Sequence, residues 1–174
     1  WFDLAHLGKS AAQHNPEKLA WLNNHYLKQA DDTRLAQLVT PHIVKLGADL
    51  AQGPALSLVV ALFKERAQTV VDIARDALLF YREPVIDPVL VQAHLPNTIL
   101  PAITQLKSKL SECDWERPAI AAAFKEVLVA HNIKMPALAM PVRLLVCGQL
   151  QTPAIDAVLA LFARSTVLSR LALA

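Results

Sequence analysis

The chain has 174 residues, of which 54% are hydrophobic and 18% are charged, and its formal net charge is +2 at pH 7. This length suffices for one large domain or two small ones with a buried core. This net charge is weak, and the wide separation of Cys113 and Cys147, together with six scattered histidines, excludes a zinc site with the usual ligand spacing.

The hydrophobic fraction raises the question of a membrane span. The longest stretch without Asp, Glu, Lys or Arg runs from Pro88 to Leu106, and Pro96 and Pro101 interrupt it. A membrane helix needs about 20 mostly apolar residues, so this stretch is a poor candidate. We therefore expect a protein of the cytoplasm that makes no membrane contact.

Only 4 glycines against 11 prolines, with frequent Ala and Leu, favour helices whose prolines lie at helix starts and in connections. Asn15 and Pro16 form the first such start, because Asn is a good N-cap and Pro suits the first helical position. Apolar residues follow at helical spacing: Leu19, Leu22 and Tyr26. We expect Trp21 and Tyr26 to belong to the core.

A second helix is expected to begin near Asp32. Its apolar face consists of Leu35, Leu38 and Val39. Pro41 has no backbone N–H to donate, so the pair Thr40-Pro41 predicts a kink or a new helix start.

The longest helical pattern runs from Gly53 to Tyr81. Its apolar positions are Leu58, Leu62, Phe63, Val70, Ile73 and Leu78. Polar residues cluster in "FKERAQT", Phe63 to Thr69, and predict a short break between two helices.

Two prolines, Pro84 and Pro88, follow in "REPVIDPVL" and predict a domain boundary. We expect one helical unit over residues 1–84 and a second over residues 85–174. Asp87-Pro88 repeats the cap signal, so helices are expected over about 88–94 and 97–110.

Asp114 is expected to cap a helix over "WERPAIAAAFKEVLVAHN", with Phe124, Val127 and Leu128 facing inward. The connection "IKMPALAMPVRLLVCG" follows, and its Val-Leu-Leu-Val run fits a short helix as well as a strand. Gly148 then allows a tight turn.

Thr152-Pro153 predicts the start of a last helix that runs to the end of the chain. Its apolar residues keep strict helical spacing: Ile155, Val158, Leu159 and Phe162. No alternating β pattern of useful length occurs, and the expected fold class is all-α.

No enzyme motif is present: there is no Gly-rich phosphate loop, no HExxH and no nucleophile elbow. From Arg117 to the end the chain has six basic residues and two acidic ones. This bias fits a solvated face or a nucleic-acid partner.

Two segments carry a family resemblance: "NPEKLAWLNNHYL" (Asn15 to Leu27) and "VRLLVCGQLQTPAIDAVLALFARSTVLSRLALA" (Val142 to Ala174). The first resembles the segment that follows the catalytic domain in bacterial glutamyl-tRNA synthetases, the discriminating class I glutamate–tRNA ligases of protein biosynthesis, and the second resembles their C-terminal end. The match in order and spacing covers essentially the whole chain, which therefore resembles the anticodon-binding half of these enzymes. The resemblance implies two helical subdomains that form a cage around the anticodon loop of tRNA(Glu). It also implies a monomer.

The same resemblance implies that the parent enzyme attaches glutamate to tRNA(Glu) with ATP. ATP, Mg and glutamate would be bound by a catalytic domain outside these 174 residues. This part of the enzyme is therefore expected to hold no cofactor or metal and to be non-catalytic alone.

The resemblance further implies residue roles. Arg66 falls where the family places an arginine against the third anticodon base, which is C for glutamate and G for glutamine. Arg143, Thr152, Pro153 and Ile155 fall where the family reads the first two bases, although Ile155 replaces a leucine. An arginine donates only, so it fits O2 and N3 of cytosine and opposes the N–H donors of guanine. A lost bond to a charged group costs about 1.5–3 kcal/mol, or roughly 10- to 150-fold in affinity.

Each role has a plainer alternative. Arg66 could form an ion pair with Asp72, and Arg143 could be a solvated surface residue. Thr152-Pro153 can be a helix cap as well as a base contact. For the whole chain, the alternative is a helical scaffold that docks a partner helix in an apolar groove, with no RNA role.

Overall fold

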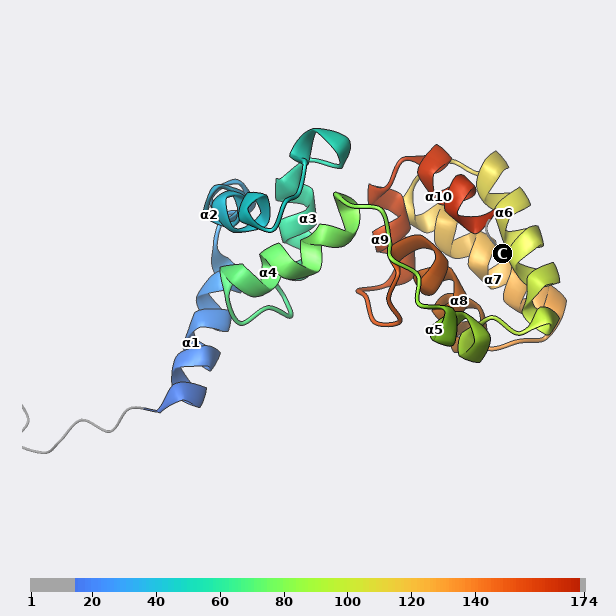
Figure 1. The fold of residues 1–174 in the computed structure, drawn as a ribbon, viewed down its shortest axis with the longest axis horizontal. Helices are drawn as coiled ribbons and strands as arrows, with labels where there is room; N and C mark the ends of the chain where they lie inside the picture. Colours follow the sequence, from blue (N-terminus) through green and yellow to red (C-terminus); the bar gives the residue numbers. More distant parts are fainter. Residues whose placement is uncertain (1–14, 173–174) are drawn as a thin grey trace, which may run out of the picture.

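The computed structural model describes residues 15–172, and these residues form ten α-helices without any β-strand (Figure 1). The all-α fold class is confirmed. The helices form two groups, which are joined by the extended segment between Tyr81 and Pro88 (Figure 1).

The N-terminal group begins with a helix that projects beyond α2 and α4 at one end of the molecule and contacts the loop between α3 and α4 (Figure 1). In this group α2 packs against both α3 and α4. Its buried centre includes Val39, Ile43, Val59, Val60 and Ile73. The helices are α1 (Pro16–Gln29), α2 (Asp32–Lys45), α3 (Leu56–Phe63) and α4 (Val70–Ala77), with 3-10 turns at Leu50–Gln52 and Leu78–Phe80.

The C-terminal group packs α6 against α7, α7 against α9, and α10 against both α6 and α8. Its centre includes Leu106, Ile120, Phe124, Leu138 and Leu159, all without exposed surface. The helices are α5 (Pro88–His94), α6 (Leu100–Glu112), α7 (Arg117–His131), α8 (Met135–Cys147), α9 (Ile155–Leu161) and α10 (Arg164–Leu171), with a 3-10 turn at Asn97–Ile99.

Two helix starts follow the sequence signals. The Asn15 side chain accepts a hydrogen bond from the backbone N–H of Lys18 at 3.0 Å, and Pro16 opens α1. The Asp87 side chain accepts from the N–H of Val89 at 2.8 Å ahead of Pro88. The break between α3 and α4 also lies where the polar cluster predicts it.

Proline is less disruptive than expected. Pro41 lies inside α2, which continues through it. Val39 and Ile43 flank Pro41 and are fully buried, so their packing offsets the lost backbone bond. The uncertain run after Met140 is helical as well, since α8 continues through Pro141.

The prediction of a single last helix from Thr152-Pro153 to the end of the chain is wrong. The chain leaves helical geometry at Phe162, which is extended and separates α9 from α10. The Phe162 carbonyl accepts from the indole N–H of Trp115 at 2.7 Å, and its ring centroid lies 4.6 Å from that of Phe80. The contacts that define this break are with Trp115 and Phe80, which lie 47 and 82 positions earlier in the chain.

Two further expectations fail at α7 and α1. Glu116, and not Asp114, occupies the N-cap of α7, and neither side chain caps it. Trp21 and Tyr26 are 65% and 61% exposed, so they are not core residues. Leu27 is the buried residue of α1.

Candidate nucleic-acid interface

Arg66 lies on the tight turn between α3 and α4, where its side chain is exposed. Its backbone N–H and that of Ala67 both donate to the carbonyl of Phe63, at 3.0 and 3.2 Å. Ala67 is 4% exposed and fixes the turn from beneath. The turn therefore presents the guanidinium outward on a well-supported backbone.

Helix α1 holds this turn from the other side. The side-chain amide of Asn24 donates to the carbonyl of Ala67 at 2.6 Å, and that of Asn23 donates to the carbonyl of Gln68. Between α1 and the turn lies an open pocket of about 570 Å³, lined in part by Trp21, Asn24 and Arg66. Sequence reasoning missed Asn23 and Asn24, because their partners lie more than 40 residues away.

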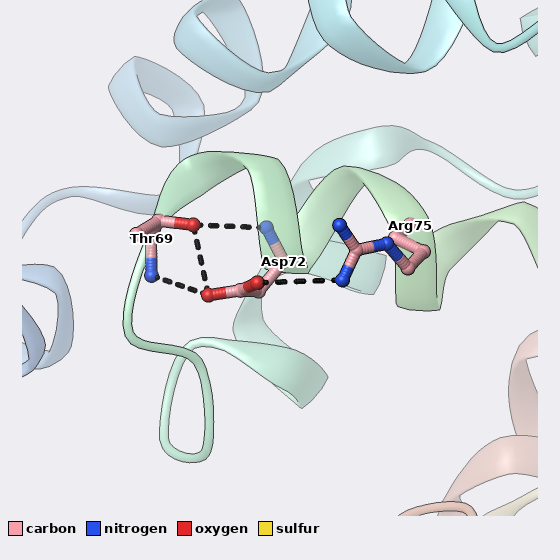
Figure 2. Close-up of polar contacts among 3 residues, drawn as sticks. All are labelled: Thr69, Asp72 and Arg75. Carbon is pink, nitrogen blue, oxygen red and sulfur yellow. Dashed lines mark hydrogen bonds and ion pairs between the residues drawn. The ribbon is translucent and has the colours of Figure 1, made fainter.

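Directly after the turn, Thr69 and Asp72 form a capping box at the start of α4 (Figure 2). The N–H of Asp72 donates to the Thr69 hydroxyl oxygen at 3.1 Å, and the N–H of Thr69 donates to the Asp72 carboxylate at 2.9 Å. Asp72 also pairs with Arg75 at 3.7 Å (Figure 2). Asp72 is therefore engaged within its own helix, and no ion pair joins it to Arg66 among the described residues.

The charge of Arg66 acts on Asp76, one helical turn beyond Asp72. Desolvation raises the pKa of the Asp76 carboxyl above its ordinary value, and the nearby Asp72 raises it further. Arg66 and Arg75 lower this pKa, so both guanidinium groups are electrostatically close to Asp76. An anion that approaches Arg66 meets a local balance of both signs.

Arg143 and Thr152 meet in the C-terminal group. The half-buried Arg143 projects from α8, and its Nε–H donates to the Thr152 hydroxyl oxygen at 3.0 Å. The hydroxyl donates in turn to the carbonyl of Pro153 at 2.9 Å. Arg143 is thus oriented by a side chain nine residues away, which leaves its terminal guanidinium N–H groups available.

Thr152 is not a helix cap. Helix α9 begins at Ile155, and Ala154 occupies its N-cap without a side-chain hydrogen bond. Pro153 and Ile155 are both buried, so they support the loop from the core side. The cap interpretation of Thr152-Pro153 is wrong, because the Thr152 hydroxyl is committed to Arg143 and Pro153.

The structure therefore brings four of the five predicted site residues together where Arg143 of α8 meets the loop that leads into α9. Arg66 lies in the other helix group. In the view of Figure 1 the α3–α4 loop and the α8–α9 loop both lie on the lower side of the molecule.

Several of the basic residues from Arg117 onward form contacts within the chain. Arg117 pairs with Asp156 at 2.7 Å, and Arg164 donates to the carbonyls of Ser111 and Cys113. Arg170 is buried at 7% exposure. Together with Arg143, four of the six basic residues therefore make contacts within the chain, and the charge count alone overstates the basic surface.

Among residues 15–172, no group of three or more His, Cys, Asp or Glu side chains is placed to hold a metal ion. No described helix combines the length and the apolar character that crossing a membrane requires.

Residues 34–174 match the family model of the anticodon binding domain. The chain is 61% identical to the glutamate–tRNA ligase of Ralstonia pickettii (strain 12J) over 99% of its length. It is 56% identical to the glutamate–tRNA ligase of Janthinobacterium sp. (strain Marseille) over 98% of its length. The chain spans about 37% of each of these relatives.

Solved structures show the same fold. The glutamate tRNA ligase of Elizabethkingia meningosepticum CCUG26117 superimposes on 98% of the chain with a TM-score of 0.81. The glutamate-tRNA synthetase of Elizabethkingia anophelis gives a TM-score of 0.78 over the same share. Each is 21% identical to the chain, which covers 34% of each.

Proposed function

This chain belongs to the anticodon-binding domain family, and from that premise we propose that it recognises the anticodon loop of tRNA(Glu) within a longer glutamate–tRNA ligase. That ligase would attach glutamate to the tRNA with ATP. The catalytic step, with ATP, Mg and glutamate, belongs to parts of the enzyme outside this chain. The enzyme is a cytoplasmic monomer that acts in protein biosynthesis.

The observation that carries this proposal is the Arg143–Thr152 pair. An arginine held by one Nε–H bond keeps its two terminal amino groups free for another acceptor, and such a planar fork suits a base edge or a phosphate. In single-stranded RNA loops the bases unstack and expose their Watson–Crick edges. We assign Arg143, Thr152, Pro153 and Ile155 to the first two anticodon bases.

Because Pro153 and Ile155 are buried, we assign them a supporting part in this contact. They hold the loop against the core while Arg143 and Thr152 offer polar groups. Burial also explains how Ile155 can stand in place of a leucine, since both are apolar and of equal size.

For the third base we assign Arg66. Its guanidinium is exposed, and no hydrogen bond or ion pair joins it to another of residues 15–172, so RNA can bind it without breaking a contact within that part of the chain. Its donors match O2 and N3 of cytosine, whereas guanine presents donors on the corresponding edge.

The test is a titration of the chain with two labelled anticodon stem-loops at one fixed salt concentration, followed by fluorescence anisotropy. One loop carries a glutamate anticodon that ends in C, and the other differs only in a terminal G. We expect the C loop to bind about tenfold more tightly or better, which is the scale of one charged hydrogen bond. Arg66→Gln should bring the ratio close to one, whereas Arg34→Gln, on the exposed face of α2, should leave it unchanged.

Equal binding of both loops by the unchanged chain would remove Arg66 as the discriminating residue. A docking scaffold is the second candidate, and the exposed apolar side chains of α1 favour it: Leu19, Trp21, Leu22 and Tyr26. Salt separates the two functions, because phosphate contacts weaken steeply with salt and an apolar groove hardly responds. Failure to bind either loop at low salt would favour the scaffold.

A further inference from the structure

Arg170 is the buried charged residue of the described chain, and its contacts reach from the C-terminal group to the segment that joins the two groups. From α10, one terminal amino group donates to the carbonyl of Val146 at 2.7 Å, close to the end of α8. The other amino group lies 3.4 Å from the carbonyl of Arg82 and 3.3 Å from the carboxylate of Glu83. The last helix is thereby connected to the segment that joins the two groups.

The backbone contacts matter more than the ion pair. The side chain of Glu83 is 89% exposed, so water screens its charge and the pair contributes little. The carbonyls of Val146 and Arg82, by contrast, lie against a side chain that is 9% exposed. A hydrogen bond to a charged donor in such surroundings is among the stronger ones.

Arg82 continues the connection into the N-terminal group. Its own guanidinium donates to the carbonyl of Leu46, which caps the end of α2. Arg82 is therefore held by α2 through its side chain and by α10 through its backbone.

Aromatic packing follows the same route. The guanidinium carbon of Arg170 lies 5.1 Å from the ring centroid of Phe162, and the Phe162 ring lies against Phe80 of the N-terminal group. Phe80 also contacts Phe63 of α3, edge to face at 6.3 Å. We call the set Phe80, Arg82, Phe162 and Arg170 the junction.

The free-energy cost of burying Arg170 also indicates that this residue serves to connect segments. Its Nε has no hydrogen-bond partner among the described residues, although the atom is buried. A buried charge with an unsatisfied donor is weak evidence for stability, and an apolar residue of the same length would avoid that cost. The planar fork nevertheless joins two carbonyls of separate segments, which an apolar side chain cannot do.

We propose that Arg170 is a positioning residue that fixes the orientation of the two helix groups and thereby the spacing between Arg66 and the Arg143–Thr152 pair. The geometric part stands on the junction contacts alone. The consequence for RNA rests on the proposed function.

Arg164 is a matched control on the same helix. It donates to the carbonyls of Ser111 and Cys113 and lies over the Trp115 ring at 5.4 Å. These contacts are of the same kinds as those of Arg170, but all of them stay within the C-terminal group. Arg164→Met thus removes comparable interactions without touching the junction.

The first measurement is the distance between two spin labels, at Gln37→Cys on α2 and Lys125→Cys on α7, both exposed positions. Cys113→Ser removes the half-buried native thiol. Cys147 stays, because burial raises the pKa of its thiol to about 12 and leaves little reactive thiolate at neutral pH. We expect a single narrow distance distribution in this background and with Arg164→Met, and a broadened one with Arg170→Met.

Equal distributions for Arg170→Met and Arg164→Met would overturn the proposal. Arg170→Lys covers the case in which Arg170→Met fails to fold. It keeps the charge but cannot satisfy both carbonyls with one planar group, so we expect intermediate broadening. An unchanged distribution in Arg170→Lys would likewise contradict the need for a two-armed donor.

The second measurement is affinity for the stem-loop that ends in C. If the binding-competent orientation falls to about a tenth of the population, the apparent affinity falls about tenfold. We expect this loss with Arg170→Met and a change below about twofold with Arg164→Met. Should the unchanged chain bind no RNA, the proposed function fails while the label distances still decide the role of Arg170. A broadened distance distribution with unchanged affinity for the stem-loop would show that the orientation of the helix groups does not affect RNA binding.

Discussion

At the scale of single residues, exposure and pairing separate residues that the sequence leaves equivalent. Arg66 and Arg170 are both arginines near apolar segments, yet one is exposed and the other is 7% exposed. The exposed one is suited to an external acceptor, because its hydration is readily exchanged for a ligand. The buried one must be satisfied internally, and its contacts are with carbonyls of the same chain.

Asp76 provides a prediction at this scale. Its pKa is raised, first by desolvation and then by Asp72, so the folded protein disfavours its carboxylate. The associated stability is present below the ordinary pKa and is lost as pH rises through the raised one. Because Asp76 is an exposed residue, water screens this effect, so we expect Asp76→Asn to raise the melting temperature at pH 7 only slightly, with the gain vanishing below about pH 4. Thermal unfolding followed by circular dichroism at both pH values measures it.

Glu65→Gln controls for the change in net charge, since Glu65 is an exposed acid on the neighbouring turn. An equal gain in that variant would show that overall charge, and not the surroundings of Asp76, is responsible.

At the scale of elements, helix ends are decided by different means in different places. Asn15 and Asp87 end their loops by local capping, which involves neighbours two or three residues away. The end of α8 differs, because Gly148 adopts a left-handed conformation with φ +70° and lies against the segment that joins the helix groups. A Cβ on Gly148 would stand 3.0 Å from the carbonyl oxygen of Val85 and 3.1 Å from Cβ of Pro84.

We expect Gly148→Ala to destabilise the protein by more than the roughly 1–2 kcal/mol that a left-handed backbone alone costs. Gly47→Ala is the comparison, because Gly47 has a similar φ of +82° and its added Cβ would displace one side-chain end, the Arg82 guanidinium at the Leu46 carbonyl, and no backbone atom. Urea unfolding of both variants gives the comparison. A loss in Gly148→Ala no larger than that in Gly47→Ala would mean that the joining segment yields easily.

At the scale of the whole molecule, the junction makes the two helix groups one packed unit. α3 of the N-terminal group contacts α9 of the C-terminal group, and Phe162 meets Phe80 between them. The packing is aromatic and buried, with Phe80 4% and Phe162 5% exposed. Such a contact favours cooperative unfolding.

We expect Phe162→Ala to cost about 3–5 kcal/mol and to make the N-terminal group exchange its amide hydrogens faster than the C-terminal group. Phe124→Ala is the control, because Phe124 is fully buried on α7 and, unlike Phe162, makes no ring contact with Phe80. Hydrogen exchange with mass spectrometry resolves α2–α4 from α6–α8. If both groups of Phe162→Ala lost their protection against amide exchange together, as in a single unfolding transition, the coupling of the groups through Phe162 would be contradicted.

Much of the helical architecture follows from local signals. Caps, first-turn prolines and the polar break after Phe63 act through neighbours in sequence, so the pattern contains them. Only part of the candidate site follows from the local sequence pattern. Arg143 and Thr152 are nine residues apart, so a short loop between them allows their contact to be predicted. The hydrogen bonds from Asn23 and Asn24 to the turn that contains Arg66 span more than 40 residues and could not be predicted in this way.

The sequence by itself determined the fold class, most helix starts and the residues to which RNA roles are assigned, because periodicity, capping and a family pattern are properties of short stretches. The tertiary structure alone decided that Thr152 serves Arg143 and not a helix, that the last helix breaks at Phe162, and that Trp21 is exposed. Each of these depends on which distant segment occupies the neighbouring space. Packing across the junction is settled only when Trp115, Phe80 and Arg170 come together around Phe162.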